Sequence, residues 1–114
     1  MESILTTIKK QIGIDESDPF FDSQIIVGIN MAISVLNQIG IGPLNGFMLI
    51  NGAETWNDYI PDLETSPRFI HVQSYIYCQT KLFFDPPTNQ TMLKYLQDKS
   101  IELEWRLKVE SEKS

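Results

Sequence analysis

The chain has 114 residues, a formal net charge of −6 at pH 7 and a single cysteine, Cys78. A chain of this length is expected to form one domain with a real core, and a lone cysteine excludes an intrachain disulfide and favours a reducing compartment. No apolar run approaches the roughly 20 residues that span a bilayer, the N-terminal residues lack a secretion signal, and the acid excess argues against electrostatic binding of nucleic acid.

Apolar residues at helical spacing predict a first helix from Ile4 to Ile12, with Ser3 as its N-cap and Gly13 as its stop. The next segment, residues 14–21, is acidic and contains a proline, which indicates a loop.

A second helix is predicted from Asp22 to Gly40, because apolar residues recur there at spacings of three and four. Asp22 stands at the N-cap position, with Phe21 and Ile26 at the positions of a hydrophobic staple. This helix carries no Lys or Arg, so it is a poor candidate for a recognition helix in the DNA major groove.

Residues 41–60 are the least regular part of the chain. An apolar run, Phe47–Ile50, lies among glycines and is followed by Asn51-Gly52. Two interpretations remain open, a short hairpin with a type I′ turn or an apolar loop packed over the domain. Trp56, Tyr59 and Ile60 then predict one or two turns of helix, which Pro61 closes.

Ser66-Pro67 predicts the start of a fourth helix that runs to about Phe84. It is apolar on more than one face, so it is expected to be central or part of an interface. Asp85-Pro86-Pro87 ends it, and a fifth helix follows from about Asn89 to about Val109. The expectation is an all-α domain of four to five helices over residues 1–109, with one Gly-rich loop or short hairpin between the second and third helices. Residues 110–114 are expected to form a flexible polar tail.

The reactive side chains form no recognisable catalytic or metal motif. His71 is the only histidine and has no partner at metal-ligand spacing. Cys78 lies two helical turns from His71, too far for a nucleophile–base pair on one straight helix. Glu102 and Arg106 are an i,i+4 pair of the kind found on solvated helix faces. We therefore expect no enzyme activity, no cofactor and no metal site.

Large aromatic side chains are unusually frequent for so small a domain, and they include Phe20, Phe21, Phe47, Trp56, Tyr59, Phe83, Phe84 and Trp105. Many of them must form the core. Those left at the surface would create an apolar patch of the kind that marks a partner site.

Five segments in order along the chain form a recognisable series, namely Ser3-Ile4-Leu5 with Ile8-Lys9-Lys10 and Gly13-Ile14, Ile39-Gly40-Ile41-Gly42-Pro43 with Gly46-Phe47, Trp56-Asn57-Asp58-Tyr59, Phe83-Phe84-Asp85-Pro86-Pro87, and Glu102-Leu103-Glu104-Trp105-Arg106-Leu107. Together they resemble the small head–tail connector (adaptor) proteins of long-tailed phages and prophages of Gram-positive bacteria. The acidic loop Asp15–Asp18 and the residues after Val109 match no part of this pattern.

The resemblance implies a non-enzymatic subunit of a ring, typically of twelve copies, that docks below the portal, extends the DNA channel and offers a platform for the stopper and tail. The implied partners are the portal protein, the stopper or tail-joining protein and further copies of the chain. Double-stranded DNA would pass through without specific binding, and no membrane is involved. The implied location is the head–tail interface of the virion, after assembly in the host cytoplasm.

The resemblance also implies roles for particular residues. The C-terminal helix of the family reaches towards the portal, which here would involve Trp105, Arg106, Lys108 and Val109. For the contact between subunits, our hypothesis names Trp56, Tyr59, Phe84, Asp85, Pro86 and Pro87.

Two other functions remain open from the sequence. The first is a small helical adaptor or regulatory protein that binds one protein partner without forming a ring. The second is a small enzyme with an unrecognised site. An activity that is lost in His71→Ala or Cys78→Ser would identify such an enzyme.

Overall fold

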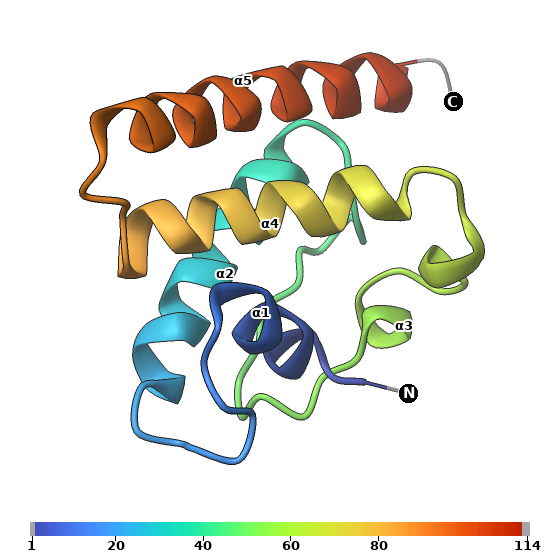
Figure 1. The fold of residues 1–114 in the computed structure, drawn as a ribbon. Helices are drawn as coiled ribbons and strands as arrows, with labels where there is room; N and C mark the ends of the chain where they lie inside the picture. The colour runs from blue at the N-terminus through green and yellow to red at the C-terminus, as the bar shows by residue number, and fades with distance from the viewer. Residues whose placement is uncertain (1, 113–114) are drawn as a thin grey trace.

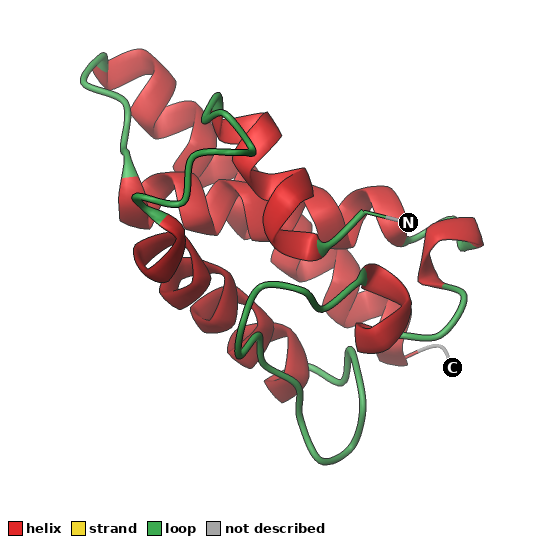
Figure 2. Ribbon diagram, turned by 90° about the horizontal axis from the view of Figure 1, so that it is seen from below, coloured by secondary structure: helices red, strands yellow, loops and turns green. Residues whose placement is uncertain are grey.

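The computed structural model describes residues 2–112, and within them the fold is entirely helical, with no β-strand (Figures 1 and 2). Helix α1 (Ile4–Ile12) has the predicted ends. The Ser3 hydroxyl accepts a hydrogen bond from the Thr6 N–H at 3.1 Å, and Gly13 leaves the helix with φ of +97°. These caps satisfy backbone groups that the helix itself leaves unpaired.

Helix α2 (Asp22–Gln38) begins one residue earlier than predicted, because Asp22 was expected to be its N-cap. Asp22 is the first helical residue, and the capping position belongs to Phe21, which makes no side-chain capping bond. Asp22 instead forms an ion pair with the buried Lys9 of α1, at 2.7 Å. The Lys9 ammonium also donates to the carbonyl oxygens of Glu16 and Asp18. Lys9 therefore fixes the acidic loop and the start of α2 against α1.

The segment between α2 and the third helix is an apolar loop, so the hairpin alternative is wrong. The loop runs back along α2, because the Asn30 side chain bonds both the N–H and the carbonyl of Leu49, at 2.7 and 3.0 Å. Gly52 has φ of +86°, and a Cβ there would lie 2.7 Å from a side-chain carbon of Leu5. Glu54 completes the loop by accepting hydrogen bonds from the N–H groups of Ile50 and Gly52.

The predicted third helix is a single turn, α3 (Trp56–Tyr59), held by a capping box between Thr55 and Asp58. A short 3₁₀ helix, η1 (Leu63–Thr65), follows it. Helix α4 (Phe69–Phe84) begins later than predicted, with Arg68 rather than Ser66 at the cap. The Ser66-Pro67 pair thus belongs to the turn that precedes the helix.

Helix α5 (Gln90–Glu112) also ends later than predicted. Residues 110–112, expected in a flexible tail, are helical here, and residues 113–114 lie outside the described part of the chain. The Ser111 hydroxyl donates to the carbonyl of Ile39 at 2.6 Å, which ties the end of α5 to the end of α2. At the other end, Asn89 caps the helix by accepting from the N–H groups of Thr91 and Met92.

Helix α4 is the centre of the domain, as its apolar faces predicted. It packs against α2 on one side and α5 on another, and it also contacts α1. In Figure 1, α5 lies above α4 and α2 passes behind it. The buried face of α5 consists of Leu96, Ser100, Leu103 and Leu107. Gly28 of α2 lies directly against Thr80 and Phe83 of α4, since a Cβ there would be 3.1 Å from a Phe83 ring carbon.

Candidate functional site

The reactive side chains are engaged in structural roles. His71 Nδ1 lies 3.0 Å from Glu110 Oε1, which joins α4 to the end of α5. Cys78 is buried, and burial raises the pKa of its thiol, which disfavours the nucleophilic thiolate. Within residues 2–112, no three His, Cys, Asp or Glu side chains gather as metal ligands. No helix in this range is both long and apolar enough to cross a membrane.

Two residues of the predicted subunit contact, Trp56 and Tyr59, lie in the core of the single chain. Each side chain is 1% exposed. The Trp56 indole donates to the Thr7 hydroxyl at 3.1 Å, and the Trp56 and Phe69 rings pack in a T-shaped arrangement. Tyr59 packs against Phe47, with ring centroids 5.1 Å apart. The Trp56 side chain and the Tyr59 ring therefore offer almost no area to a neighbour, and we correct their assignment to a role inside the subunit. Tyr59 also lines a hollow, and its hydroxyl, unlike its ring, has no partner among the described residues.

The other predicted contact residues form an aromatic corner at the end of α4. We use this name for Phe20, Phe21 and the Phe84–Pro87 turn. The Phe84 and Phe21 rings pack in a T-shaped arrangement with their centroids 5.2 Å apart, and the Phe21 and Phe20 rings do the same with their centroids 4.7 Å apart. Phe20 is 78% exposed, and Asp85 and Pro86 are also exposed. The loop after α1 and the end of α4 thus form one surface, which the sequence did not predict because the two segments are far apart in the chain.

The predicted portal-contact residues lie on the last three turns of α5. Trp105 is 65% exposed, and Lys108 and Val109 follow it at helical spacings of three and four, so they share its outer face. Ile101, one turn earlier, is also exposed. Arg106 points to a different side, where it forms an ion pair with Glu102 at 2.9 Å. We call Ile101, Trp105, Lys108 and Val109 the outer face of α5.

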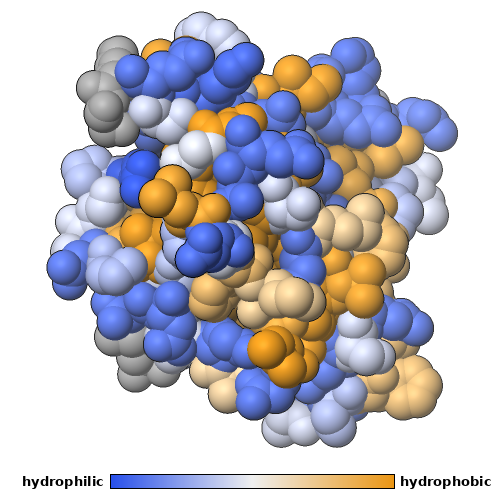
Figure 3. All heavy atoms as spheres, turned by 180° about the vertical axis from the view of Figure 1, so that it is seen from behind, coloured by the Kyte–Doolittle hydropathy of each residue, from blue (hydrophilic) through white to orange (hydrophobic). Residues whose placement is uncertain are grey.

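A further surface, which the sequence analysis missed, runs along α2 and the loop that covers it. Its exposed apolar side chains are Val27 and Met31 on α2 and Met48 and Ile50 on the loop. The Asn30–Leu49 hydrogen bonds hold the two segments together. Figure 3 views the molecule from behind, the side to which α2 lies in Figure 1, and shows apolar groups exposed among polar ones.

We call this surface the neutral face, because none of residues 23–53 is charged. All 15 acids and nine Lys and Arg residues of the chain lie in the remaining segments. Depletion of charge around exposed apolar side chains is typical of the centre of a protein interface. The gap in the charge distribution is readable from the sequence and would have located this face.

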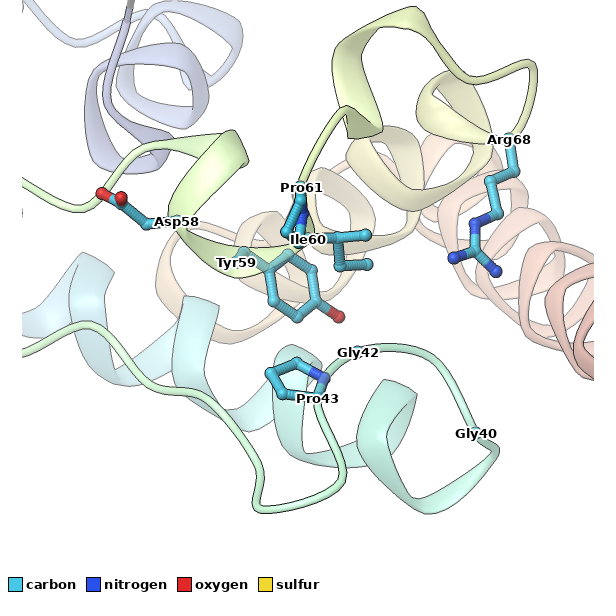
Figure 4. Close-up of a pocket in the computed structure, with 8 residues that line it drawn as sticks. All are labelled: Gly40, Gly42, Pro43, Asp58, Tyr59, Ile60, Pro61 and Arg68. Carbon is cyan, nitrogen blue, oxygen red and sulfur yellow. The ribbon is translucent and has the colours of Figure 1, made fainter.

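A hollow also lies where the loop after α2 meets the segment between α3 and α4 (Figure 4). Figure 4 shows the Tyr59 hydroxyl directed towards the space between Gly42 and Arg68, and the Arg68 guanidinium extends into the same space. Gly42 has φ of +110°, and a Cβ there would lie 2.9 Å from the Tyr59 ring, so only glycine allows this close approach. The hollow is lined by Gly40, Gly42, Pro43, Asp58, Tyr59, Ile60, Pro61 and Arg68.

Comparison with known proteins gives one match. The model of a family described as phage connector protein matches residues 4–114, nearly the whole chain. Neither a curated protein nor a solved structure matches the chain. The family match confirms the resemblance to phage connector proteins, and the matched residues include all the surfaces described above.

Proposed function

The chain belongs to the phage connector protein family, and we propose that its copies form a ring below the portal that extends the DNA channel and carries the stopper and tail. A role in the head–tail connector of a phage, and a place in the virion, follow from the family itself. The ring, its docking to the portal and the attachment of the stopper are our proposal.

The observation that carries the proposal is the neutral face. A chain with a net charge of −6 repels further copies of itself wherever its acids face one another. The neutral face presents Val27, Met31, Met48 and Ile50 to solvent without any nearby charge from its own segments. It is therefore the surface on which a second copy can approach and bury apolar area most favourably.

The neutral face continues towards the aromatic corner. Phe83 is half exposed and rests directly on Gly28 of α2, next to Val27 in the chain, while the neighbouring Phe84 belongs to the corner. In a closed ring, one face of each subunit meets a different face of the next. We propose that the neutral face and the corner together form one side of that contact.

The outer face of α5 is proposed to contact the portal. Trp105 is a large apolar side chain, 65% exposed, on the outward side of a long helix, and such rings are enriched at interface centres. Lys108 beside it adds a positive charge. The acidic balance of the chain suits a channel through which DNA slides, because phosphate-binding clusters of Lys and Arg would hold it.

A charge placed on the neutral face tests the ring. The purified chain is mixed with the portal protein of the same phage, and native mass spectrometry counts the copies bound. Met31→Lys is expected to reduce the number of copies held in the ring, while the control Tyr95→Lys, exposed on α5 outside the proposed surfaces, leaves it unchanged. Circular dichroism checks that both variants keep their helices. A wild-type chain that binds the portal in one copy, or remains alone, would contradict the ring.

A further inference from the structure

The hollow beside Arg68 plays no part in the surfaces above. The chain has two arginines. Arg106 is paired with Glu102, whereas no carboxylate within residues 2–112 lies within ion-pair distance of Arg68. Arg68 is only partly exposed. A guanidinium presents several N–H donors in a fixed fork that matches a carboxylate, so an unpaired one in a hollow is suited to an acidic ligand.

A second donor in the same hollow lacks an acceptor. The Tyr59 side chain is 1% exposed, and its hydroxyl has no hydrogen-bond partner among the described residues. Burial raises the pKa of this hydroxyl, and the nearby positive charge of Arg68 opposes that effect. The phenol is therefore a neutral donor. Leaving such a group unpaired is costly, and an acceptor brought by a ligand would remove that cost.

We propose that this hollow binds the carboxylate of an Asp or Glu side chain from a neighbouring copy of this chain, with Arg68 as its ion-pair partner and Tyr59 as a hydrogen-bond donor. The proposal rests on the ring proposed above, in which every subunit has an identical neighbour. The chain itself supplies the complementary charge, since it has 15 acids against nine Lys and Arg residues.

The lining of the hollow favours a carboxylate over a DNA phosphate. Arg68 is the only basic residue of its lining, which also includes the acidic Asp58. Proteins that bind the DNA backbone gather several Lys and Arg side chains, and none other is found here. The hollow has a volume of about 400 Å³, which is room for a side chain rather than a single water molecule of about 30 Å³.

The free chain provides the first test, which does not depend on any ring. Acetate, the simplest carboxylate, is titrated into the full chain at constant ionic strength, with inorganic phosphate as a second arm, and NMR follows the Gly42 amide and the Arg68 side chain. Saturable shifts with acetate are expected, weakened about tenfold or more by Arg68→Gln and unchanged by the control Lys94→Gln. Absence of saturable shifts, or a clear preference for phosphate, would overturn the proposal.

Tyr59→Phe separates binding from folding. Since the hydroxyl has no partner in the free chain, its removal should leave the urea midpoint of unfolding unchanged or slightly higher, yet weaken acetate binding. A lower midpoint would mean that the hydroxyl is already satisfied inside the subunit, which contradicts its proposed role.

The assembled ring provides the last test. Arg68→Gln should lower the number of copies held on the portal, whereas Lys94→Gln should not. If the wild type forms no ring, the proposed function fails while the acetate result stands by itself. If the ring forms and Arg68→Gln assembles as fully as the wild type, the role of the hollow between copies is wrong.

Discussion

The two tryptophans of the chain offer the sharpest comparison between core and surface. Trp56 is 1% exposed and Trp105 is 65% exposed. Replacing a buried tryptophan by alanine removes its apolar area and leaves a cavity, which typically costs about 3–5 kcal/mol of unfolding free energy. Trp56→Ala also deletes the indole hydrogen bond to Thr7, worth about 1 kcal/mol. The Thr7 hydroxyl is not left without a partner, since it still donates to the Ser3 carbonyl. The two contributions together give an expected loss of at least about 4 kcal/mol.

Trp105→Ala removes a side chain with little contact inside the subunit, so its cost should stay within about 0.5 kcal/mol. Urea unfolding followed by circular dichroism measures both variants without relying on tryptophan fluorescence. A loss of about 4 kcal/mol is a large fraction of the 5–15 kcal/mol typical of a domain, so Trp56→Ala should unfold at a much lower urea concentration. Equal losses in the two variants, or a loss below about 1 kcal/mol for Trp56→Ala, would refute the assignment of Trp56 to the core.

Three further predictions concern the parts that shape the surfaces. Lys9→Met removes the buried ammonium that pairs with the partly exposed Asp22 and bonds the carbonyls of Glu16 and Asp18, and it should cost about 3 kcal/mol in urea unfolding; a loss below about 1 kcal/mol would contradict the role of Lys9. Gly52→Ala should destabilise more than Gly13→Ala, since both glycines have positive φ but only a Cβ at Gly52 meets another atom within 4 Å; equal melting temperatures would contradict this. Burial tends to raise the pKa of Glu54, yet the hydrogen bonds from backbone N–H groups outweigh burial and lower the pKa. The ionised Glu54 therefore stabilises the fold above about pH 4.5, and this stabilisation is lost as the pH falls through the lowered pKa. Glu54→Gln should make the free energy of unfolding less dependent on pH between pH 3 and 7.

Local signals in the sequence predicted the helices well. Ser3 and Gly13 stand at the two ends of α1, as the capping rules predict. Asp22 was misplaced because its real partner, Lys9, lies on another helix. A capping rule considers only neighbours in the chain, so it cannot predict an acidic residue whose partner is a lysine on another helix.

The candidate surfaces were harder to predict. Trp56 lies on a helix of four residues, which is too short to show a buried and an exposed face by periodicity. Its burial depends on contacts with Thr7 and Phe69, far away in the chain. The neutral face was missed for a different reason, because its exposed side chains are aliphatic or methionine rather than aromatic, and it is marked in the sequence only by the absence of charge from residues 23–53.

In the central proposal, copies of this chain surround the DNA channel beneath the portal. Electron cryomicroscopy of the portal vertex of the virion tests it directly. We predict a ring of helical subunits into which this fold can be placed, with the neutral face of each copy against its neighbour and the outer face of α5 towards the portal. A portal vertex whose density holds no copy of this fold would contradict that proposal.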